Sequence, residues 1–479
     1  MRKCDLLIKG GTVIDGTGAP GFLADVAVDG GRICAVGQLC EFRAGHVIEA
    51  TGQVVAPGFI DVHTHDDWAV LQTPDMACKI TQGVTTVIAG NCGISAAPFR
   101  FQSGLPAPFN VVPGMEIADF STVELYENAV NQAKPAVNVM LLAGHSALRA
   151  QVMGTDLDRP ASEAEIGQMA QVLDQALAQG ACGLSSGLDY PAAFAAPTKE
   201  MTRLARVVSH HPGRVYTTHM RDEGDGVVAS VREALETGKS SGARLVISHH
   251  KCAGQANFGK SIETLGMIDA ARETQDIGFD VYPYVASSTA LIERFLPSAK
   301  EIKVIWSDAH PEQGGRMLDD IAEDWSVDRS EAARRLHPAG AIYFDMDEGD
   351  LQRIMAHPLA MIGSDGLPGT QKPHPRLWGT FPRVLGRYVR ELNLLSLAQA
   401  IHKMTGLSAD TFGIKDRGFV RDGYVADLVI FDPHSVLDKA DYDDPEVPSA
   451  GINHVFVAGE EAMKDGMPTS SRAGQFLKG

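Results

Sequence analysis

Two histidines follow an apolar run near the start of the chain and are separated by a single residue. The segment runs from Phe59 to Asp67 and contains His63 and His65. Side chains two residues apart on a strand lie on the same face, so the two imidazoles are expected side by side at a strand end. Such a pair could bind a transition metal such as zinc. Paired histidines also occur in surface turns, so this motif alone leaves both interpretations open.

Further potential metal ligands follow later strand-like runs. Thr85–Ala89 precedes Cys92, for example, and Ala360–Gly363 precedes Asp365. The candidates in chain order are His63, His65, Cys92, His219, His249 and Asp365. In a parallel barrel the carboxyl ends of all strands open on one face, where the site lies. The sequence therefore predicts a metal site built from residues that are far apart in the chain.

The elements that would position these residues are strands alternating with helices. After Pro57, short apolar runs alternate with amphipathic segments; the clearest helix starts at the capping box of Ser162 and Glu165 and ends at Gly180. This alternation predicts an α/β fold with a (β/α)8 TIM-like barrel. An open doubly wound sheet is the alternative, but no glycine-rich phosphate loop supports it.

The two ends of the chain have a different pattern, rich in short strands and turns. Residues 1–57 and 415–479 are both of this kind, and neither segment alone has enough strands for a stable core. We therefore predict a small β-sandwich domain built from both termini and a barrel over 58–414. The alternation breaks at about 287–345, which predicts an inserted subdomain over the barrel mouth.

Composition restricts the class of partner. The chain has 479 residues, of which 44% are hydrophobic, and its net charge of -18 argues against nucleic acid and anionic membranes as partners. No signal-peptide core and no membrane-spanning run is evident. Seven cysteines in such a long chain indicate reduced thiols, so the cytoplasm is the expected compartment. The sequence does not indicate an oligomeric state.

The six candidate ligands together resemble the amidohydrolase superfamily. The segments 90–93, 218–221, 248–251 and 363–366 are similar to those of the N-acyl-D-amino-acid deacylases, or D-aminoacylases. The resemblance covers nearly the whole chain, including the split β domain with its returning strand at 423–429. Many relatives bridge two metals with a carboxylated lysine after the fourth strand, but 183–187 contains no lysine. The resemblance implies that the Cys92 thiolate takes this position.

The resemblance implies zinc-dependent hydrolysis of N-acyl-D-amino acids to a carboxylate and a free D-amino acid. It implies that Cys92, His219 and His249 hold one tightly bound zinc, while the His-X-His pair and Asp365 border a second, weakly filled position. Zinc would polarise the amide carbonyl and lower the pKa of bound water toward ~7. Asp365 would then accept a proton from the water and deliver it to the leaving amine. The preference for the D configuration is an expectation from the resemblance alone.

The substrate of such an enzyme carries an α-carboxylate, whose burial requires cations and hydrogen-bond donors. The resemblance supports four residues as carboxylate binders: Lys251, Tyr282, Ser288 and Arg376. Tyr190 is expected to line the pocket or to be a core aromatic. His374 lies in a segment expected to be a mobile loop, and we assign it no catalytic role.

Arg294, where the insert begins, bears on the side chain of the substrate. Relatives acting on apolar D-amino acids would present an apolar wall, whereas an arginine would bind a carboxylate side chain bidentately. We therefore hypothesise an acidic substrate, N-acyl-D-glutamate before N-acyl-D-aspartate. The alternative is a surface pair of Arg294 with Glu293 or another salt bridge within the insert.

Three other functions are compatible with such a barrel. One is a cyclic amide hydrolase similar to hydantoinase or dihydroorotase, another is a deaminase, and the third is a non-catalytic scaffold. Cys92 in place of the lysine bridge weighs against the first, and the Ser248–Lys251 motif weighs against both enzymes. Because every ligand type is present, the scaffold is the least favoured.

Overall fold

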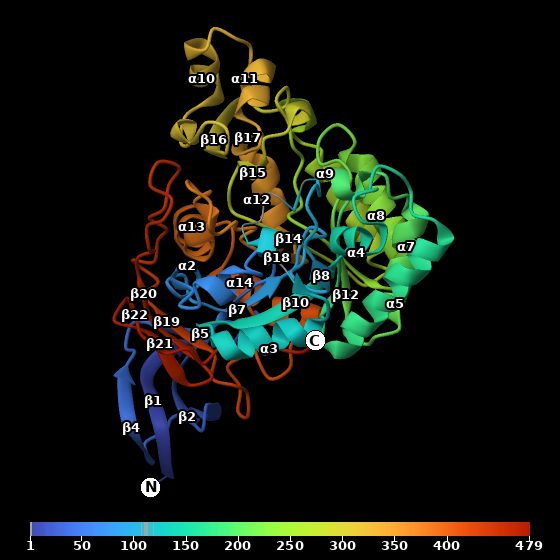
Figure 1. Cartoon of the computed structure of the whole chain (residues 1–479). Helices are drawn as coiled ribbons and strands as arrows, with labels where there is room; N and C mark the ends of the chain where they lie inside the picture. Colours follow the sequence, from blue (N-terminus) through green and yellow to red (C-terminus); the bar gives the residue numbers. More distant parts are fainter. Residues whose placement is uncertain (1, 107, 110–113, 118) are drawn as a thin grey trace.

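A computed structural model describes residues 2–106, 108–109, 114–117 and 119–479. Figure 1 shows a central barrel, with a sheet formed by the two ends of the chain on one side and a small subdomain on the opposite side.

The centre of the molecule is a parallel sheet that curves into a barrel. Within the described ranges it has eight strands: β6 (Phe59–Asp61), β7 (Val84–Ala89), β10 (Asn138–Gly144), β11 (Gly183–Gly187), β12 (Val215–His219), β13 (Arg244–Ile247), β14 (Ile277–Val281) and β18 (Ala360–Ile362). Just past the first and last strands, Thr64 forms a parallel bridge with Gly366, and Asp365 N donates to His63 O at 2.8 Å. These contacts close the seam, so the predicted barrel is confirmed over the open sheet.

Helices cover the outside of the barrel (Figure 1). They include α3 (Val123–Ala133), α4 (His145–Met153), α5 (Glu163–Gln179), α7 (Thr198–Ser209), α8 (Val227–Ser241), α9 (Ser261–Ala271), α12 (Glu348–Ala356) and α14 (Leu397–Met404). The start of α5 has the predicted capping box of Ser162 and Glu165, and its end is Gly180 with φ of 120°. None of the helices in the described residues is long and apolar enough to cross a membrane.

The two ends of the chain pair in a second sheet. In the part of the chain that is described, its nine strands are β1 (Arg2–Val13), β2 (Phe22–Asp29), β3 (Arg32–Gly37), β4 (Phe42–Glu49), β5 (Val54–Pro57), β19 (Leu428–Phe431), β20 (Ile452–Val457), β21 (Glu460–Lys464) and β22 (Met467–Pro468). β19 runs antiparallel to β5, and Ile8, Val26 and Leu428 share one hydrophobic core. The terminal segments thus complete each other as predicted; the boundaries at about 57 and 414 stay a proposal.

The subdomain lies between β14 and α12 in the chain. Its sheet has the order β15 (Ser287–Ala290), β17 (Ala339–Phe344) and β16 (Glu301–Ser307), all antiparallel, with α10 (Leu318–Asp324) and α11 (Arg329–Leu336) packed on a core of its own. Because it follows the carboxyl end of β14, it lies over the barrel mouth, where Figure 1 shows it at the top. The segment 287–345, which interrupts the predicted alternation, therefore forms a sheet and a core of its own between two elements of the barrel.

Candidate metal centre and substrate cavity

Three of the six candidate ligands have an unusual backbone. Cys92, His249 and Asp365 have φ values of 54°, 34° and 49°, in the left-handed region that residues with a Cβ rarely adopt. Each follows the end of a barrel strand, namely β7, β13 and β18. A residue held in this conformation costs about 1–3 kcal/mol, and such strain is concentrated at functional sites.

These turns bring four donor atoms together at the barrel mouth. Nε2 of His63 lies 3.3 Å from Sγ of Cys92 and 3.5 Å from Oδ1 of Asp365. Sγ of Cys92 lies 3.4 Å from Nε2 of His249. One donor atom from each of these four buried residues lies within 4.8 Å of the others. His65 joins the group, because its Nε2 lies 3.2 Å from Oδ1 of Asp365.

His219 lies beside this cluster. Its ring centroid is 4.5 Å from that of His249, and its Nε2 is 3.8 Å from the carboxylates of Asp189 and Glu223. Among the described residues, neither ring nitrogen of His219 has a hydrogen-bond partner, and neither does Nδ1 of His65. Buried nitrogens are normally paired, so these free lone pairs fit residues whose partner is a metal ion.

The charges of the cluster also suit a cation. Burial raises the pKa of the Cys92 thiol, but His63 and His249 outweigh it and hold this pKa well below its usual value. Burial likewise raises the pKa of the Asp365 carboxyl, which Arg376 and His63 bring well below its ordinary range. A thiolate, a carboxylate and imidazoles form a borderline-soft set of ligands, which fits zinc.

Carboxylates behind the cluster hold the imidazoles in place. Nδ1 of His63 lies 3.2 Å from Oδ1 of Asp280, which also accepts a hydrogen bond from the His249 amide at 2.9 Å. Nδ1 of His249 lies 2.9 Å from Oε1 of Glu223. Such carboxylate–histidine pairs orient metal-binding rings. Neither acid was predicted from the sequence. Asp280 stands out as an acid within a buried strand, whereas the acidic loop around Glu223 gives no distinct pattern.

A buried ion cluster supports the seam of the barrel. Nζ of Lys79 lies 2.8 Å from Asp61, 3.2 Å from Asp66 and 3.0 Å from Oγ of Ser364, and all four residues are fully buried. Asp61 also accepts from the Ser364 amide at 2.8 Å. The cluster thus connects the two segments that carry the His-X-His pair and Asp365. These residues were also missed, although Asp61 is another acid inside an apolar run.

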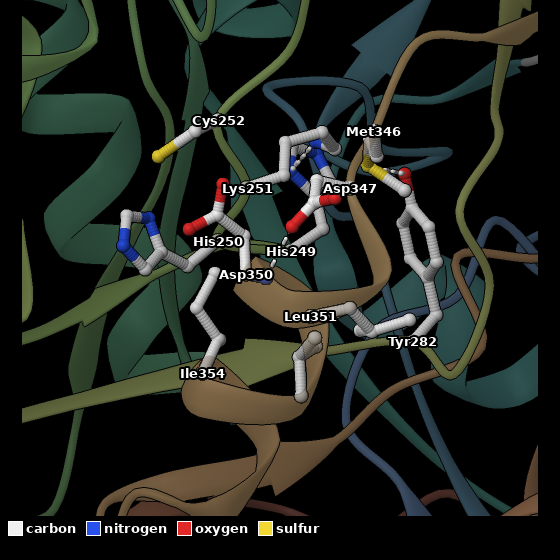
Figure 2. Close-up of a pocket in the computed structure, with 11 residues that line it drawn as sticks. His249, His250, Lys251, Cys252, Tyr282, Met346, Asp347, Asp350, Leu351 and Ile354 are labelled. Atoms are coloured by element: carbon white, nitrogen blue, oxygen red, sulfur yellow. Dashed lines mark hydrogen bonds between the residues drawn. The ribbon is translucent and has the colours of Figure 1, made fainter. Parts of the chain in front are cut away.

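A cavity of about 1320 Å³ opens beside the cluster, between the loops after β11, β12, β13 and β14 and the insert. Its lining includes the candidate ligands His219, His249 and Asp365. Five of the predicted substrate residues also line it: Tyr190, Lys251, Tyr282, Ser288 and Arg294. A smaller cavity lies next to it, and Figure 2 shows His249, Lys251 and Tyr282 on its wall.

Lys251 lies between the metal cluster and the cavity. Its Nζ is 2.6 Å from Oε2 of Glu223 and 2.8 Å from Nδ1 of His249. The hydroxyl of Ser288, also on the cavity wall, is buried and has no hydrogen-bond partner among the described residues. These two side chains therefore offer a cation and a free hydroxyl to a ligand in the cavity.

Arg376 lies deeper than predicted from the sequence. Its Nη1 is 2.9 Å from Oδ2 of Asp365, its guanidinium stacks 4.6 Å from the Tyr282 ring centroid, and its Nη2 donates to Ser288 O at 3.1 Å. The side chain is fully buried and is not among the residues that line the large cavity. His374 is also buried, and its Nδ1 accepts from the Arg376 amide at 3.0 Å.

Arg294, at the start of the insert, contacts the loop after β11 that carries Asp189 and Tyr190. Nη2 of Arg294 lies 2.6 Å from Oδ1 of Asp189, and its guanidinium stacks 4.8 Å from the Phe295 centroid. Arg294 thus pairs with the barrel rather than with Glu293 or within the insert. Tyr190 places its ring 4.9 Å from that of His219, with its hydroxyl 3.1 Å from Oγ1 of Thr289.

Comparison with known proteins agrees with this architecture. The model of the Amidohydrolase family matches residues 46–296 and 306–462. The D-aminoacylase of Alcaligenes xylosoxydans xylosoxydans is 47% identical over 99% of this chain and 97% of its own length. The N-acyl-D-glutamate deacylase of the same organism is 45% identical over 100% of this chain and 97% of its own.

A solved structure of a related deacylase has the same fold as this chain. The N-acyl-D-glutamate deacylase of Bordetella bronchiseptica, complexed with zinc and a phosphonate that mimics the tetrahedral intermediate, superimposes with a TM-score of 0.94 at 46% identity. The match covers 100% of both chains. Fold and sequence agree, and the chain belongs to the amidohydrolase family.

Proposed function

We propose that this chain is a metal-dependent hydrolase that cleaves the amide bond of N-acyl-D-amino acids, giving a carboxylate and a free D-amino acid. The observation that carries the proposal is the cluster of a thiolate, imidazoles and an ionised aspartate beside a cavity lined by Lys251 and Ser288. The names of the relatives support the substrate class and are the sole support for the D configuration.

We assign one tightly bound zinc to Cys92, His219 and His249. His63, His65 and Asp365 would border a second, weaker position. Bound zinc would polarise the amide carbonyl and make water a nucleophile at neutral pH. The free ring nitrogens of His219 and the depressed pKa of the Cys92 thiol support this assignment.

Asp365 is the proposed general base and acid. It is ionised, because Arg376 and His63 hold its pKa well below the ordinary range against the opposing effect of burial. It also lines the cavity, so its carboxylate can take a proton from the attacking water. The same proton is then delivered to the leaving nitrogen, since an amine must depart in the protonated form.

The α-carboxylate of the substrate would be held by Lys251, Tyr282 and Ser288 on the cavity wall. A buried carboxylate needs cations and donors, and the free hydroxyl of Ser288 is such a donor. Arg376 is engaged by Asp365 at 2.9 Å, which favours a role in keeping Asp365 ionised. Its assignment to the substrate carboxylate stays a prediction.

Arg294 supports an acidic substrate side chain, N-acyl-D-glutamate before N-acyl-D-aspartate. Its guanidinium lines the cavity and is held from one side by Asp189. A guanidinium has five N–H donors, so this ion pair leaves donors for a carboxylate in the cavity. Tyr190, which lies beside His219, would form the neighbouring wall.

The decisive experiment is a panel of N-acetyl D- and L-amino acids together with hydantoins, assayed with and without added zinc. Hydrolysis of linear D-substrates that depends on zinc supports the proposal, and turnover confined to hydantoins refutes it. Cys92 in place of a bridging lysine weighs against the cyclic amide hydrolase, and none of the relatives named above is one. A scaffold without activity would turn over no member of the panel, even when metal analysis shows bound zinc.

We retain the cytoplasm as the predicted compartment. All seven cysteines lie within the described ranges and are unpaired there, which supports a reducing environment.

A further inference from the structure

Glu223 contacts both a proposed zinc ligand and a proposed substrate-binding residue. Its Oε1 lies 2.9 Å from Nδ1 of His249, and its Oε2 lies 2.6 Å from Nζ of Lys251. Nζ of Lys251 itself lies 2.8 Å from the same Nδ1 of His249, a contact that Figure 2 also shows. The three groups therefore form a closed triangle around one ring nitrogen. The Lys251 contact has hydrogen-bond geometry, whereas Oε1 of Glu223 is close to the ring but makes no hydrogen bond with any described residue.

The two contacts at Nδ1 of His249 require different tautomers of the neutral imidazole. A carboxylate can only accept, so the Glu223 contact needs a proton on Nδ1 of His249. A lysine ammonium can only donate, so the Lys251 contact needs a lone pair on Nδ1, which places the ring proton on Nε2. Nε2 is the atom that faces Cys92 Sγ, at 3.4 Å. A neutral imidazole binds zinc through Nε2 only when the proton is on Nδ1.

The loop that carries Glu223 is fixed from several sides. The carbonyl of Glu223 accepts from the Ala253 amide at 2.7 Å, which connects the loop after β12 to the loop after β13. Asp222 accepts from the amides of Gly224 at 2.7 Å and Gly226 at 3.1 Å. These hydrogen bonds hold the Glu223 carboxylate next to the His249 ring. The Lys251 ammonium offsets the negative charge of Glu223.

We propose that Glu223 is a positioning residue that selects the zinc-binding tautomer of His249. It accepts the Nδ1 proton and binds the Lys251 ammonium with its second oxygen, which keeps the ammonium from donating to the ring. Nε2 of His249 then presents its lone pair to the metal beside Cys92. The inference rests on the proposed zinc site and adds a role that the six candidate ligands do not include.

The test is the zinc affinity of the full-length protein after removal of the metal, measured by competition with a chromophoric chelator. Glu223→Gln keeps the size of the side chain, but its amide or Lys251 then donates to Nδ1. The expected result is zinc binding that is about 10–100-fold weaker.

Asp345→Asn is the matched control. Asp345 is a second buried acid on the cavity wall, and it interacts electrostatically with Lys251 and Glu223. No described contact joins it to His249. Burial raises the pKa of Asp345 to about 7, so the affinities are compared at pH 8, where the substitution removes a carboxylate charge without changing the tautomer. Its zinc affinity should stay within about threefold of the wild type, since the effect of Glu223 comes from its contact with the ring.

Two results would overturn the inference: zinc affinity unchanged in Glu223→Gln, or equal weakening in Asp345→Asn, which would indicate a charge effect alone. If Glu223→Gln does not fold, Glu223→Asp serves in its place, because the shorter side chain keeps the charge and withdraws from Nδ1. Unchanged affinity in Glu223→Asp would equally refute the idea. Failure of the amide panel would instead refute the proposed function, so the two outcomes are separable.

Discussion

The substitution Arg294→Leu tests the proposed preference for an acidic side chain. Arg294 lines the cavity, and leucine keeps an apolar side chain there while removing the guanidinium. If this group binds the substrate side chain, the substitution lowers kcat/KM on N-acetyl-D-glutamate and leaves or raises it on N-acetyl-D-leucine. The ratio of the two values cancels effects on zinc binding and on the chemistry common to both substrates.

The expected magnitude follows from the surroundings of Arg294. A hydrogen bond to a charged group contributes about 1.5–3 kcal/mol. The side chain is 40% exposed and already pairs with Asp189 at 2.6 Å, so solvent and a competing carboxylate reduce its contribution. We therefore take the lower end, about 1.5–2 kcal/mol, which corresponds to a change in the ratio of about 10–30-fold.

Steady-state kinetics on the two N-acetyl substrates measure the ratio, and two variants serve as controls. Arg294→Lys keeps the charge without the planar fork and should have an intermediate ratio. Arg334→Leu removes an arginine on the same insert that pairs with Glu331 at 2.7 Å and does not line the cavity, so its ratio should stay at the wild-type value. A ratio in Arg294→Leu that moves by less than about threefold would refute the preference for an acidic side chain.

Three further predictions concern the support of the site and its chemistry. Lys79→Met leaves the buried carboxylate of Asp61 without its cation and should lower the free energy of unfolding by about 3–5 kcal/mol in urea denaturation; a loss below about 1 kcal/mol contradicts the role of the cluster. Asp365→Asn should lower kcat by about 10²–10⁴-fold while the protein retains one tightly bound zinc by metal analysis, and near-normal kcat would exclude Asp365 as the base. Burial raises the pKa of Glu200, but His145 and Arg149 bring it down to about 2, below the ordinary value for a glutamate. Because this pKa is depressed on folding, the stabilisation of about 3 kcal/mol is present above pH ~4.5 and is lost as the pH falls toward ~2. The stability difference between wild type and Glu200→Gln should shrink over that range in thermal melts, and a constant difference would refute the assignment.

The fold could be predicted because its determinants are local. The capping box of Ser162 and Glu165 and the alternation of strands and helices are visible within short windows of sequence, and the structure has both. The joining of the two ends of the chain in one β unit was inferred from an incomplete set of strands at each end, and the structure pairs β5 with β19. Such arguments need no knowledge of which side chains meet across the barrel.

The environment of the site was less predictable, because it depends on contacts between loops. The sequence places Lys251 and Arg376 near the carboxyl ends of strands, but it does not show that Glu223 and Asp365 engage them. The carboxylates behind the ligands were missed for the same reason. Of these two carboxylates, Asp280 had a visible cue, since it interrupts an apolar strand, as Asp61 also does.

The seam of the barrel has a consequence for how the enzyme becomes active during synthesis. Asp61 and Ser364, which are hydrogen-bonded across the seam, are 303 positions apart in the chain. At translation rates of about 5–20 residues per second, the ribosome needs on the order of 15–60 seconds to make the intervening residues. Cys92, His219 and His249 are all made within that interval, and all three precede Asp365 in the chain. In the proposed mechanism, the three ligands of the tightly bound zinc are therefore complete before the proposed base is made, and catalysis begins only when the last strand docks against the first.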